Sequence, residues 1–460
     1  MAPCRETQCR EIVGLQNSNE EKTKMFLKVN KIAKLSVIML LTLFATTSWA
    51  ATYYVAKNQS NASDSNSGSE SNPFKTIQEG INHAYPGDTV YVKEGVYYEY
   101  ILLPRSGTAS NRIIIKKYGN DSVVVDGSNH SNYRVVYWGS GDGHDYITWE
   151  LDVRNGSSEG IWVEGDYVTI QNCKVYNCKK TGITITESDH LYMTNVESYD
   201  NDWNGVNCQS STNSLVENCI FRGNWDHYGF QFFHDTSKPA QMWTGNVLKD
   251  SVIYGNNNGI YLRYQEDGAI INNIIYDNAG YGIQTSNEPG EFSTYEGRTK
   301  IYNNTIVDNL SYAINNEAAT KLYIKNNIIA SNGGGILDGR SSSNHVIDYN
   351  LYYNNATLFK WGSNTYSTIS NLQSAIGYEA HGLVGNPYFN DALNRDYTLK
   401  SSSLAIDKGA NLSTEAPATT KDLIGTQRPQ NLNYDIGAYE YKSGTTTTTL
   451  SAPTNLRIIM

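Results

Sequence analysis

Short runs of alternating apolar and polar residues follow one another along most of this chain, separated by asparagine and glycine. Their period of two residues is typical of β-strands, and none has the length or period of a helix. Many start with a glycine and an apolar residue, as in GITIT, GVNCQ, GFQFF, GIYLR, GIQTS and GILDG, which begin at Gly182, Gly205, Gly229, Gly259, Gly282 and Gly335. The pattern predicts an all-β protein built of many short strands.

A second pattern indicates how these strands are arranged. An asparagine or cysteine recurs shortly before most of the glycines, usually 22 or 23 residues apart, in a column of Cys178, Asn201, Asn224, Asn256, Asn278, Asn309, Asn332 and Asn355. A strand with one apolar face cannot bury it alone, whereas stacked copies can. Stacking at roughly 4.8 Å per coil gives a parallel β-solenoid. Because asparagine suits tight turns, we interpret the column as structural.

The period is similar to the right-handed parallel β-helix of the pectate-lyase-like superfamily, over most of residues 51–442. The stretch from Tyr53 to Glu99 resembles the entry segment of such proteins, and its FKTIQEGINHA (74–84) is expected to be a short helix that caps the stack. RPQNLNYDIGAYEY (428–441) resembles their closing segment. The resemblance implies a secreted polysaccharide lyase, epimerase or hydrolase.

The two ends of the sequence differ from the repeat. Residues 25–50 predict a signal peptide, because lysines precede an apolar run and a small-x-small cleavage site ends it at Ala50. Residues 1–24 lack signal character and are expected to be an over-extended start. Residues 443–460 combine a Thr-rich linker with the beginning of a further module. We therefore expect a protein that is secreted or on the cell surface.

Charge narrows the set of partners. The formal net charge is -10, from 36 basic and 46 acidic residues, which disfavours binding to nucleic acid or to an anionic membrane surface. No stretch after the N-terminal region approaches the roughly 20 apolar residues of a membrane span. We expect a monomer whose partner is a polysaccharide.

Two coils are longer than the others, and both additions follow the glycine-led strand. They are His234–Gly245 and Asn287–Arg298, and the unexpanded coil between them contains GIYLRYQ. Insertions in a solenoid form loops on one face, often the binding face. We expect two walls about 10 Å apart, with Tyr261 and Arg263 on the floor between them.

Strand parity indicates which side chains face away from the core. The first and third residues after each glycine are apolar and are expected to point inward, so the second and fourth point outward. Amides, aromatic rings and one arginine on such a face suit a sugar chain. The two outward ladders are Trp162, Thr184, Asn207, Gln231, Tyr261, Gln284 and Asn315, and Glu164, Thr186, Gln209, Phe233, Arg263 and Ser286.

The resemblance implies that polysaccharide is cleaved on this face. Arg263 is the cationic side chain there that could assist the reaction. A lyase removes the proton beside a uronate carboxylate; an arginine can act as the base or can bind the carboxylate with two hydrogen bonds. Since arginine is normally protonated, the clamp is the simpler role. Tyr228 and His227 are further proton-transfer candidates. The catalytic candidates are Arg263, Tyr261, His234 and Asp235, and the substrate-binding candidates are Trp162, Asn207, Gln231, Phe233, Tyr264, Gln284, Glu288 and Glu291.

Calcium is the cofactor that the resemblance implies. Asp200, Asp202 and Asp226 precede successive glycine-led strands, so their carboxylates are expected to converge on a hard cation. The outward ladders contain no acid other than Glu164, which departs from the groove aspartates of calcium-dependent pectate lyases.

Three alternatives to a lyase stay open at this point. YGFQFFHD (228–235) resembles the catalytic strand of mannuronan epimerases, although Gln231 and Phe233 replace its Asp and His. Asp235 facing Glu288 or Glu291 would suit a hydrolase that inverts configuration, whose carboxyls lie about 6.5–9.5 Å apart. The third alternative is a polysaccharide-binding or adhesive protein without catalysis.

Overall fold

The structure is a computed structural model that describes residues 50–131, 133–139, 144–233, 243–286, 298–317, 321–341 and 344–443. The expected start and signal segments before residue 50, and the Thr-rich tract after residue 443, lie outside the described residues. So do most of the two insertions and the candidates His234, Asp235, Glu288 and Glu291.

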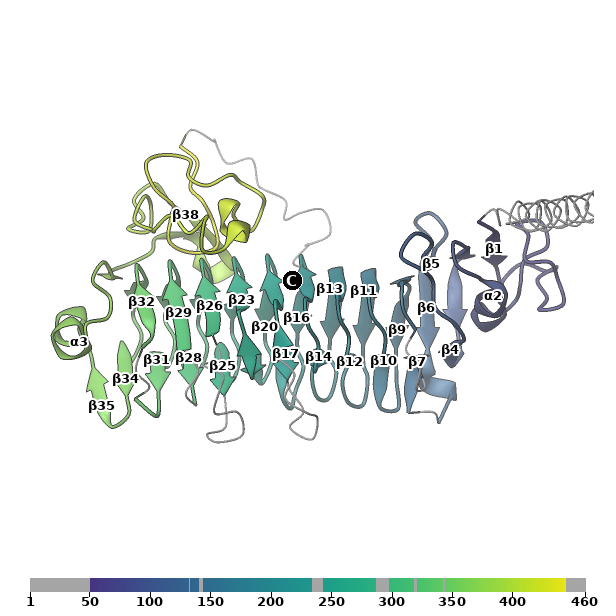
Figure 1. The fold of residues 1–460 in the computed structure, drawn as a ribbon, viewed down its shortest axis with the longest axis horizontal. Helices are drawn as coiled ribbons and strands as arrows, with labels where there is room; N and C mark the ends of the chain where they lie inside the picture. Colours follow the sequence, from purple (N-terminus) through teal and green to yellow (C-terminus); the bar gives the residue numbers. More distant parts are fainter. Residues whose placement is uncertain are drawn as a thin grey trace, which may run out of the picture. The chain divides into compact units, whose positions relative to one another are not determined.

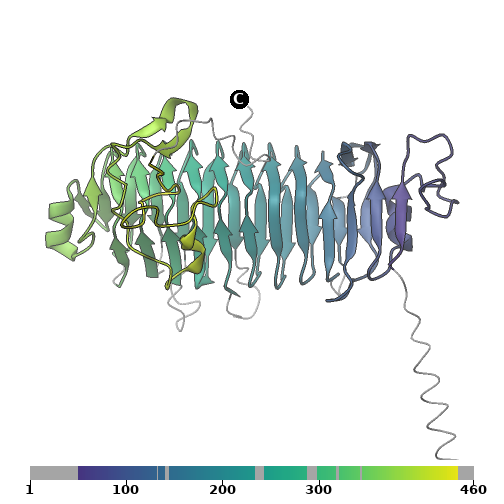
Figure 2. The same cartoon turned by 90° about the horizontal axis from the view of Figure 1, so that it is seen from above.

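The described chain is a right-handed parallel β-helix, as the repeat predicts (Figures 1 and 2). Its strands form two long sheets, which we call the first and second sheets. The second sheet has 12 described strands and contains the glycine-led strands of the repeat. These are β4 (Ile101–Leu103), β7 (Arg134–Trp138), β10 (Glu159–Val163), β12 (Ile183–Thr186), β14 (Val206–Gln209), β17 (Tyr228–Phe233), β21 (Asn258–Arg263), β25 (Ile283–Ser286), β28 (Tyr312–Asn316), β31 (Gly334–Asp338), β34 (Phe359–Trp361) and β35 (Asn364–Tyr366).

The first sheet has 22 described strands and forms the remaining sides of each coil. They are β1 (Thr52–Val55), β2 (Thr89–Val92), β3 (Gly95–Tyr97), β5 (Ile113–Lys117), β6 (Val123–Asp126), β8 (Ile147–Glu150), β9 (Asp152–Arg154), β11 (Thr169–Tyr176), β13 (Tyr192–Tyr199), β15 (Leu215–Glu217), β16 (Ile220–Arg222), β19 (Val247–Lys249), β20 (Val252–Tyr254), β23 (Gly268–Ile271), β24 (Ile274–Tyr276), β26 (Arg298–Tyr302), β27 (Thr305–Val307), β29 (Lys321–Lys325), β30 (Ile328–Ala330), β32 (Val346–Asp348), β33 (Leu351–Tyr353) and β36 (Leu383–Val384).

Helices close the stack. The predicted N-terminal capping helix is present as α2 (Ile77–His83), where the Thr76 side chain accepts a hydrogen bond from the backbone N–H of Glu79. Helix α3 (Ile369–Ile376) follows the last coil. The remaining elements are β18 (Trp243–Thr244), β22 (Gln265–Glu266), β37 (Phe389–Asp391), β38 (Asp396–Leu399) and the 3-10 helices η1 (Gly127–Asn129), η2 (Ala392–Asn394) and η3 (Pro417–Thr420).

The core confirms the predicted strand parity. Ile183 and Ile185 are fully buried, and the corresponding pairs of the next coils are also buried. The four described cysteines are buried and unbridged, because neighbouring coils do not bring two of them into bonding distance; they are Cys173, Cys178, Cys208 and Cys219.

The predicted asparagine column is a buried ladder of side-chain hydrogen bonds. The Nδ2 of Asn256 donates to Asn278 Oδ1 at 3.1 Å, and Asn278 donates to Asn309 at 2.9 Å. A second ladder, which the sequence analysis missed, runs from Asn273 to Asn350 and ends on Glu379, whose Oε1 accepts from Asn350 Nδ2 at 2.7 Å. Both ladders satisfy polar groups that the turns bring into the core.

A C-terminal segment, residues 386–441, packs on the first sheet (Figure 1). Its Arg395 contacts Asp277 at 2.5 Å and Asp308 at 2.9 Å, so one guanidinium links two coils. This segment therefore leaves the outward face of the second sheet for other contacts.

Candidate functional site

The second sheet aligns the predicted outward residues in register. Tyr261 on β21 pairs with Gln231 on β17 and with Gln284 on β25. The same column continues in one direction through Asn207 and Thr184 to Trp162 and in the other direction to Asn315. The second ladder pairs Gln209 with Phe233 and Arg263 with Ser286. The predicted pairing of these side chains from coil to coil is therefore confirmed.

Arg263 ends β21 and lies among aromatic rings. Its guanidinium carbon is 5.3 Å from the ring centre of Phe233 and 5.1 Å from that of Tyr264, so both predicted neighbours are brought to it. Its Nε is buried and has no hydrogen-bond partner in the described residues. Arg263 also forms no ion pair with any described carboxylate, unlike Arg298, which contacts Glu266 at 2.5 Å. When a buried N–H of a charged guanidinium has no acceptor, the folded protein loses free energy, unless a bound ligand supplies the acceptor.

Tyr261 is held by its neighbours on the two adjoining coils. Its ring stacks on Tyr228 at 4.7 Å, and its hydroxyl is 2.6 Å from Ser286 Oγ. The hydroxyl of Tyr228 donates to Gln284 Oε1 at 2.8 Å. Burial, followed by the neighbouring Tyr261, raises the pKa of Tyr228, which keeps that hydroxyl protonated as a donor. The side chains next to Arg263 are therefore fixed in one arrangement.

The expectation that the two outward ladders are exposed is wrong for several members. Thr184, Gln231, Gln284, Ser286 and Asn315 are buried, whereas Trp162, Asn207, Phe233, Tyr261 and Arg263 are half-buried. Side chains in neighbouring coils stand one strand spacing apart and cover one another, and Gln284 is also engaged by Tyr228. The accessible polar surface is therefore smaller than the sequence indicates.

Both insertions leave the same edge of the second sheet. One follows β17 and the other follows β25, and β21 lies between these strands in the sheet. That part of the prediction is confirmed. The loops themselves, with His234, Asp235, Glu288 and Glu291, lie outside the described residues, and their roles stay predictions.

The three candidate metal ligands do not converge. Asp202 lies 3.6 Å from Lys179, and Asp226 lies 3.3 Å from His227. Within the described residues, no three His, Cys, Asp or Glu side chains form a group that could hold a metal ion, and that includes the set with Asp200. The reason is side-chain direction, because the carboxylates of Asp202 and Asp226 point toward different partners in their own turns. Calcium binding as such stays a prediction.

Sequence reasoning missed a second cationic cluster on the same sheet. Arg134 on β7 has its guanidinium carbon 3.8 Å from the ring centre of Trp162 and 4.6 Å from that of Tyr137. Tyr137 pairs in register with Trp162 and with Leu102, so the outward column starts two coils earlier than predicted. This cluster was not predicted because the strand of the β7 coil does not begin with the glycine that marks the other strands. Its sequence RVVYW nevertheless aligns with EGIWV.

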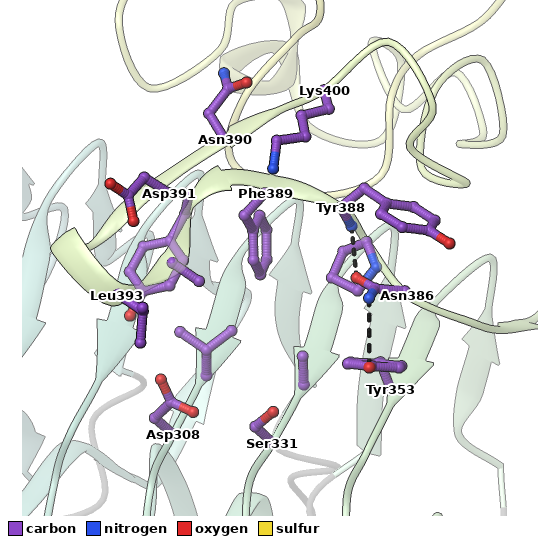
Figure 3. Close-up of a pocket in the computed structure, with 15 residues that line it drawn as sticks. Asp308, Ser331, Tyr353, Asn386, Tyr388, Phe389, Asn390, Asp391, Leu393 and Lys400 are labelled. Carbon is purple, nitrogen blue, oxygen red and sulfur yellow. Dashed lines mark hydrogen bonds between the residues drawn. The ribbon is translucent and has the colours of Figure 1, made fainter.

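A separate pocket of about 370 Å³ lies under the C-terminal segment (Figure 3). Its lining includes Tyr353 on β33, Asp308 and Ser331, which directly follow β27 and β30, and Phe389 on β37. The Nδ2 of Asn386 donates to the Tyr353 hydroxyl at 3.3 Å across it. It belongs to the seam between segment and solenoid and not to the face that carries Arg263.

Within the described residues, no helix is long and apolar enough to cross a membrane. The fold and the registered outward columns define a right-handed parallel β-helix protein. Residues 53–327, more than half of the chain, match the model of the Pel9A-like right-handed β-helix region. The chain belongs to this family.

The curated proteins to which this chain is similar include the following two. The uncharacterized protein YwoF of Bacillus subtilis is 23% identical over 425 residues, which cover 75% of this chain and 90% of YwoF. Pectate lyase PEL9 of Emericella nidulans is 34% identical over 80 residues, only 17% of this chain and 19% of that enzyme.

Solved structures share the fold. The crystal structure of pectate lyase Pel9A has a TM-score of 0.58 and 18% identity, over 86% of this chain and 98% of that one. The complex of XylC with xylose has a TM-score of 0.53 and 12% identity, over 84% and 98%. At these identities the comparisons establish the β-helix and not the reaction.

Proposed function

We propose that this protein is a secreted polysaccharide lyase that cleaves a uronate-containing glycan, of the pectate or alginate type, by β-elimination. The observation that carries the proposal is the environment of Arg263. Its half-buried guanidinium packs near two aromatic rings and forms no ion pair with a described carboxylate. A uronate carboxylate is the acceptor that fits, because a planar guanidinium binds it with two parallel hydrogen bonds.

The role of Arg263 follows from the reaction. β-Elimination removes the proton on the carbon next to the carboxylate and expels the glycosidic oxygen, so negative charge develops on the carboxylate. A fixed cation there stabilises that charge in the transition state. Tyr261 lies two residues away on the same outward face and is the described candidate for proton transfer that we favour, and His234 and Asp235 are the further candidates. Export rests on the predicted signal peptide.

The proposal is tested by incubating the protein with pectate, alginate and neutral glycans, each with and without calcium. Unsaturated ends, read by their absorbance, and reducing ends are measured separately. The proposal predicts that both products rise together on an acidic glycan. Reducing ends without unsaturated ends would indicate hydrolysis, a change of uronate configuration without cleavage would indicate epimerisation, and binding without either product would indicate an adhesive role.

The calcium arm tests the cofactor independently. Retained activity after chelation would reject calcium as a requirement. Lost activity that returns with calcium would support it, although Asp200, Asp202 and Asp226 do not form its site in the described structure.

A further inference from the structure

Arg134 begins β7, near the N-terminal end of the second sheet, and it packs on aromatic rings as Arg263 does at the end of β21. Its guanidinium stacks on Trp162 at 3.8 Å and on Tyr137 at 4.6 Å, and its Nε is buried without a hydrogen-bond partner among the described residues. Glu159 is opposite Arg134 in register, yet the two form no ion pair. The cation is therefore held in place by rings and lacks a carboxylate partner in the described part of the chain.

The rings beneath Arg134 are themselves fixed. The indole Nε1 of Trp162 donates to Glu164 Oε1 at 2.8 Å, which engages the one acid of the outward ladders. The Glu164 carboxylate thus positions the ring on which the guanidinium stacks. An arginine stacked in this way presents its fork with little loss of conformational freedom on binding.

A second cation and two exposed rings lie beside this cluster. Lys180 has its Nζ 4.8 Å from the ring centre of Tyr133, the residue before Arg134, and 5.2 Å from that of Trp203. Tyr133 is 64% exposed and Trp203 is 42% exposed. Lys180 forms no ion pair with a described carboxylate, whereas its neighbour Lys179 contacts Asp202 at 3.6 Å. Flat exposed rings next to unpaired cations are suited to acidic sugars, whose ring faces are apolar and whose carboxylates are charged.

We propose that Arg134 and Lys180, with Tyr133 and Trp203, form a distal binding site for a chain of acidic sugars that also reaches Arg263. Five strand pairings lead from β7 through β10, β12, β14 and β17 to β21. The two sites are thus about 24 Å apart along the solenoid and lie at opposite edges of the second sheet, so a chain that joins them crosses the sheet over about 30 Å. The proposal rests on the proposed function, because it assigns the same class of glycan to both sites. The site selects long acidic chains over short ones.

The test measures binding in the Arg263→Ala background by isothermal titration calorimetry, so that cleavage does not consume the ligand. The probes are an oligogalacturonate long enough to span about 30 Å, a galacturonate disaccharide and a neutral galacto-oligosaccharide of matched length. Arg134→Gln should weaken binding of the long acidic probe about tenfold, the effect of losing one charge-assisted contact. The neutral probe should bind weakly to every variant.

Two further variants keep the test decisive. Lys180→Gln removes the second cation, which lies in a turn. It must also lower the affinity for the long acidic probe, even if Arg134→Gln disturbs β7. Lys116→Gln is the matched control, because Lys116 also lies over a ring, 5.0 Å from the centre of Tyr91, but on the first sheet. Equal affinities of the Arg134, Lys180 and Lys116 variants for the long probe would overturn the distal site.

The outcome separates this inference from the proposed function. The wild-type chain could cleave acidic glycan while Arg134→Gln and Lys180→Gln bind the long probe as tightly as their parent. That result would support the lyase function and contradict the distal site. If no cleavage is seen but both variants bind the long probe more weakly, the distal site stands and the lyase falls.

Discussion

The hydroxyl of Tyr228 donates a hydrogen bond to Gln284 Oε1 at 2.8 Å, although the two residues lie on strands β17 and β25 with β21 between them. To do so, the Tyr228 ring stacks on Tyr261 at 4.7 Å. One side chain therefore links the three coils around the candidate site. The coil that carries Arg263 is held between its neighbours by side chains as well as by backbone pairing.

Replacing Tyr228 by phenylalanine tests this link. The ring stack is kept, but Gln284 Oε1 loses its donor, so the free energy of unfolding should fall by about 1 kcal/mol. Urea unfolding measures the loss. Tyr98→Phe is the control, because the exposed Tyr98 hydroxyl has no hydrogen bond in the described residues, and it should be neutral. Equal stability of the two variants would mean that the link contributes nothing.

The asparagine ladder should be far more sensitive. Asn278 Oδ1 accepts from both the backbone N–H and the Nδ2 of Asn256, and all of these groups are buried. Asn278→Ala leaves the buried backbone N–H of Asn256 unpaired, whereas Asn256 Nδ2 keeps the carbonyls of Phe221 and Tyr254 as acceptors. This predicts a loss of about 2 kcal/mol in the free energy of unfolding. Thermal and urea unfolding check it. Asn129→Ala, at an exposed asparagine, should change stability by less than about 0.5 kcal/mol.

Glu379 predicts a pH dependence of stability. Burial raises the pKa of its carboxyl from 4.5 to about 7. The carboxyl then ionises more readily in the unfolded chain, so stability falls as the pH rises from about 4.5 to about 7. The full effect is about 3 kcal/mol. Glu379→Gln keeps an acceptor for Asn350 Nδ2 and the Tyr352 hydroxyl, which both donate to Oε1.

The measurement compares unfolding of wild type and Glu379→Gln across this pH range. The glutamine variant should lose less stability than the wild type as the pH rises. Parallel curves would contradict the shift. Taking the difference between the two proteins removes the contribution of Asp435, whose pKa burial also raises to about 7.

Much of the fold follows from the sequence because each coil repeats the same physical problem. The spacing of Asn256 and Asn278 and the parity of Ile260 and Leu262 determine register, so the columns could be predicted before any contact was known. The second asparagine ladder carries the same signal, since Asn304, Asn327 and Asn350 are also 23 residues apart, and it was detectable.

Contacts that cross columns could not be predicted in this way. Strand parity would point Arg134 inward with Val136, yet at the strand's beginning it leans over Trp162 instead. Tyr228 likewise has the parity of an inward residue, yet its ring stacks on that of Tyr261. The failed convergence of Asp200, Asp202 and Asp226 has a related cause, because proximity in a turn does not determine which way each carboxylate points. Side-chain direction at strand ends depends on turn geometry, which a two-residue period does not encode.

The most direct test of the central claim is the rate at which unsaturated uronate ends form from the acidic glycan that the wild type cleaves, compared with Arg263→Ala and Arg263→Lys. If Arg263 holds the carboxylate, kcat/KM should fall about a hundredfold in the alanine variant, with partial recovery in lysine, which keeps the charge but not the two-point contact. Lys116→Ala on the first sheet should retain the wild-type rate. Full activity of a folded Arg263→Ala variant would contradict the account.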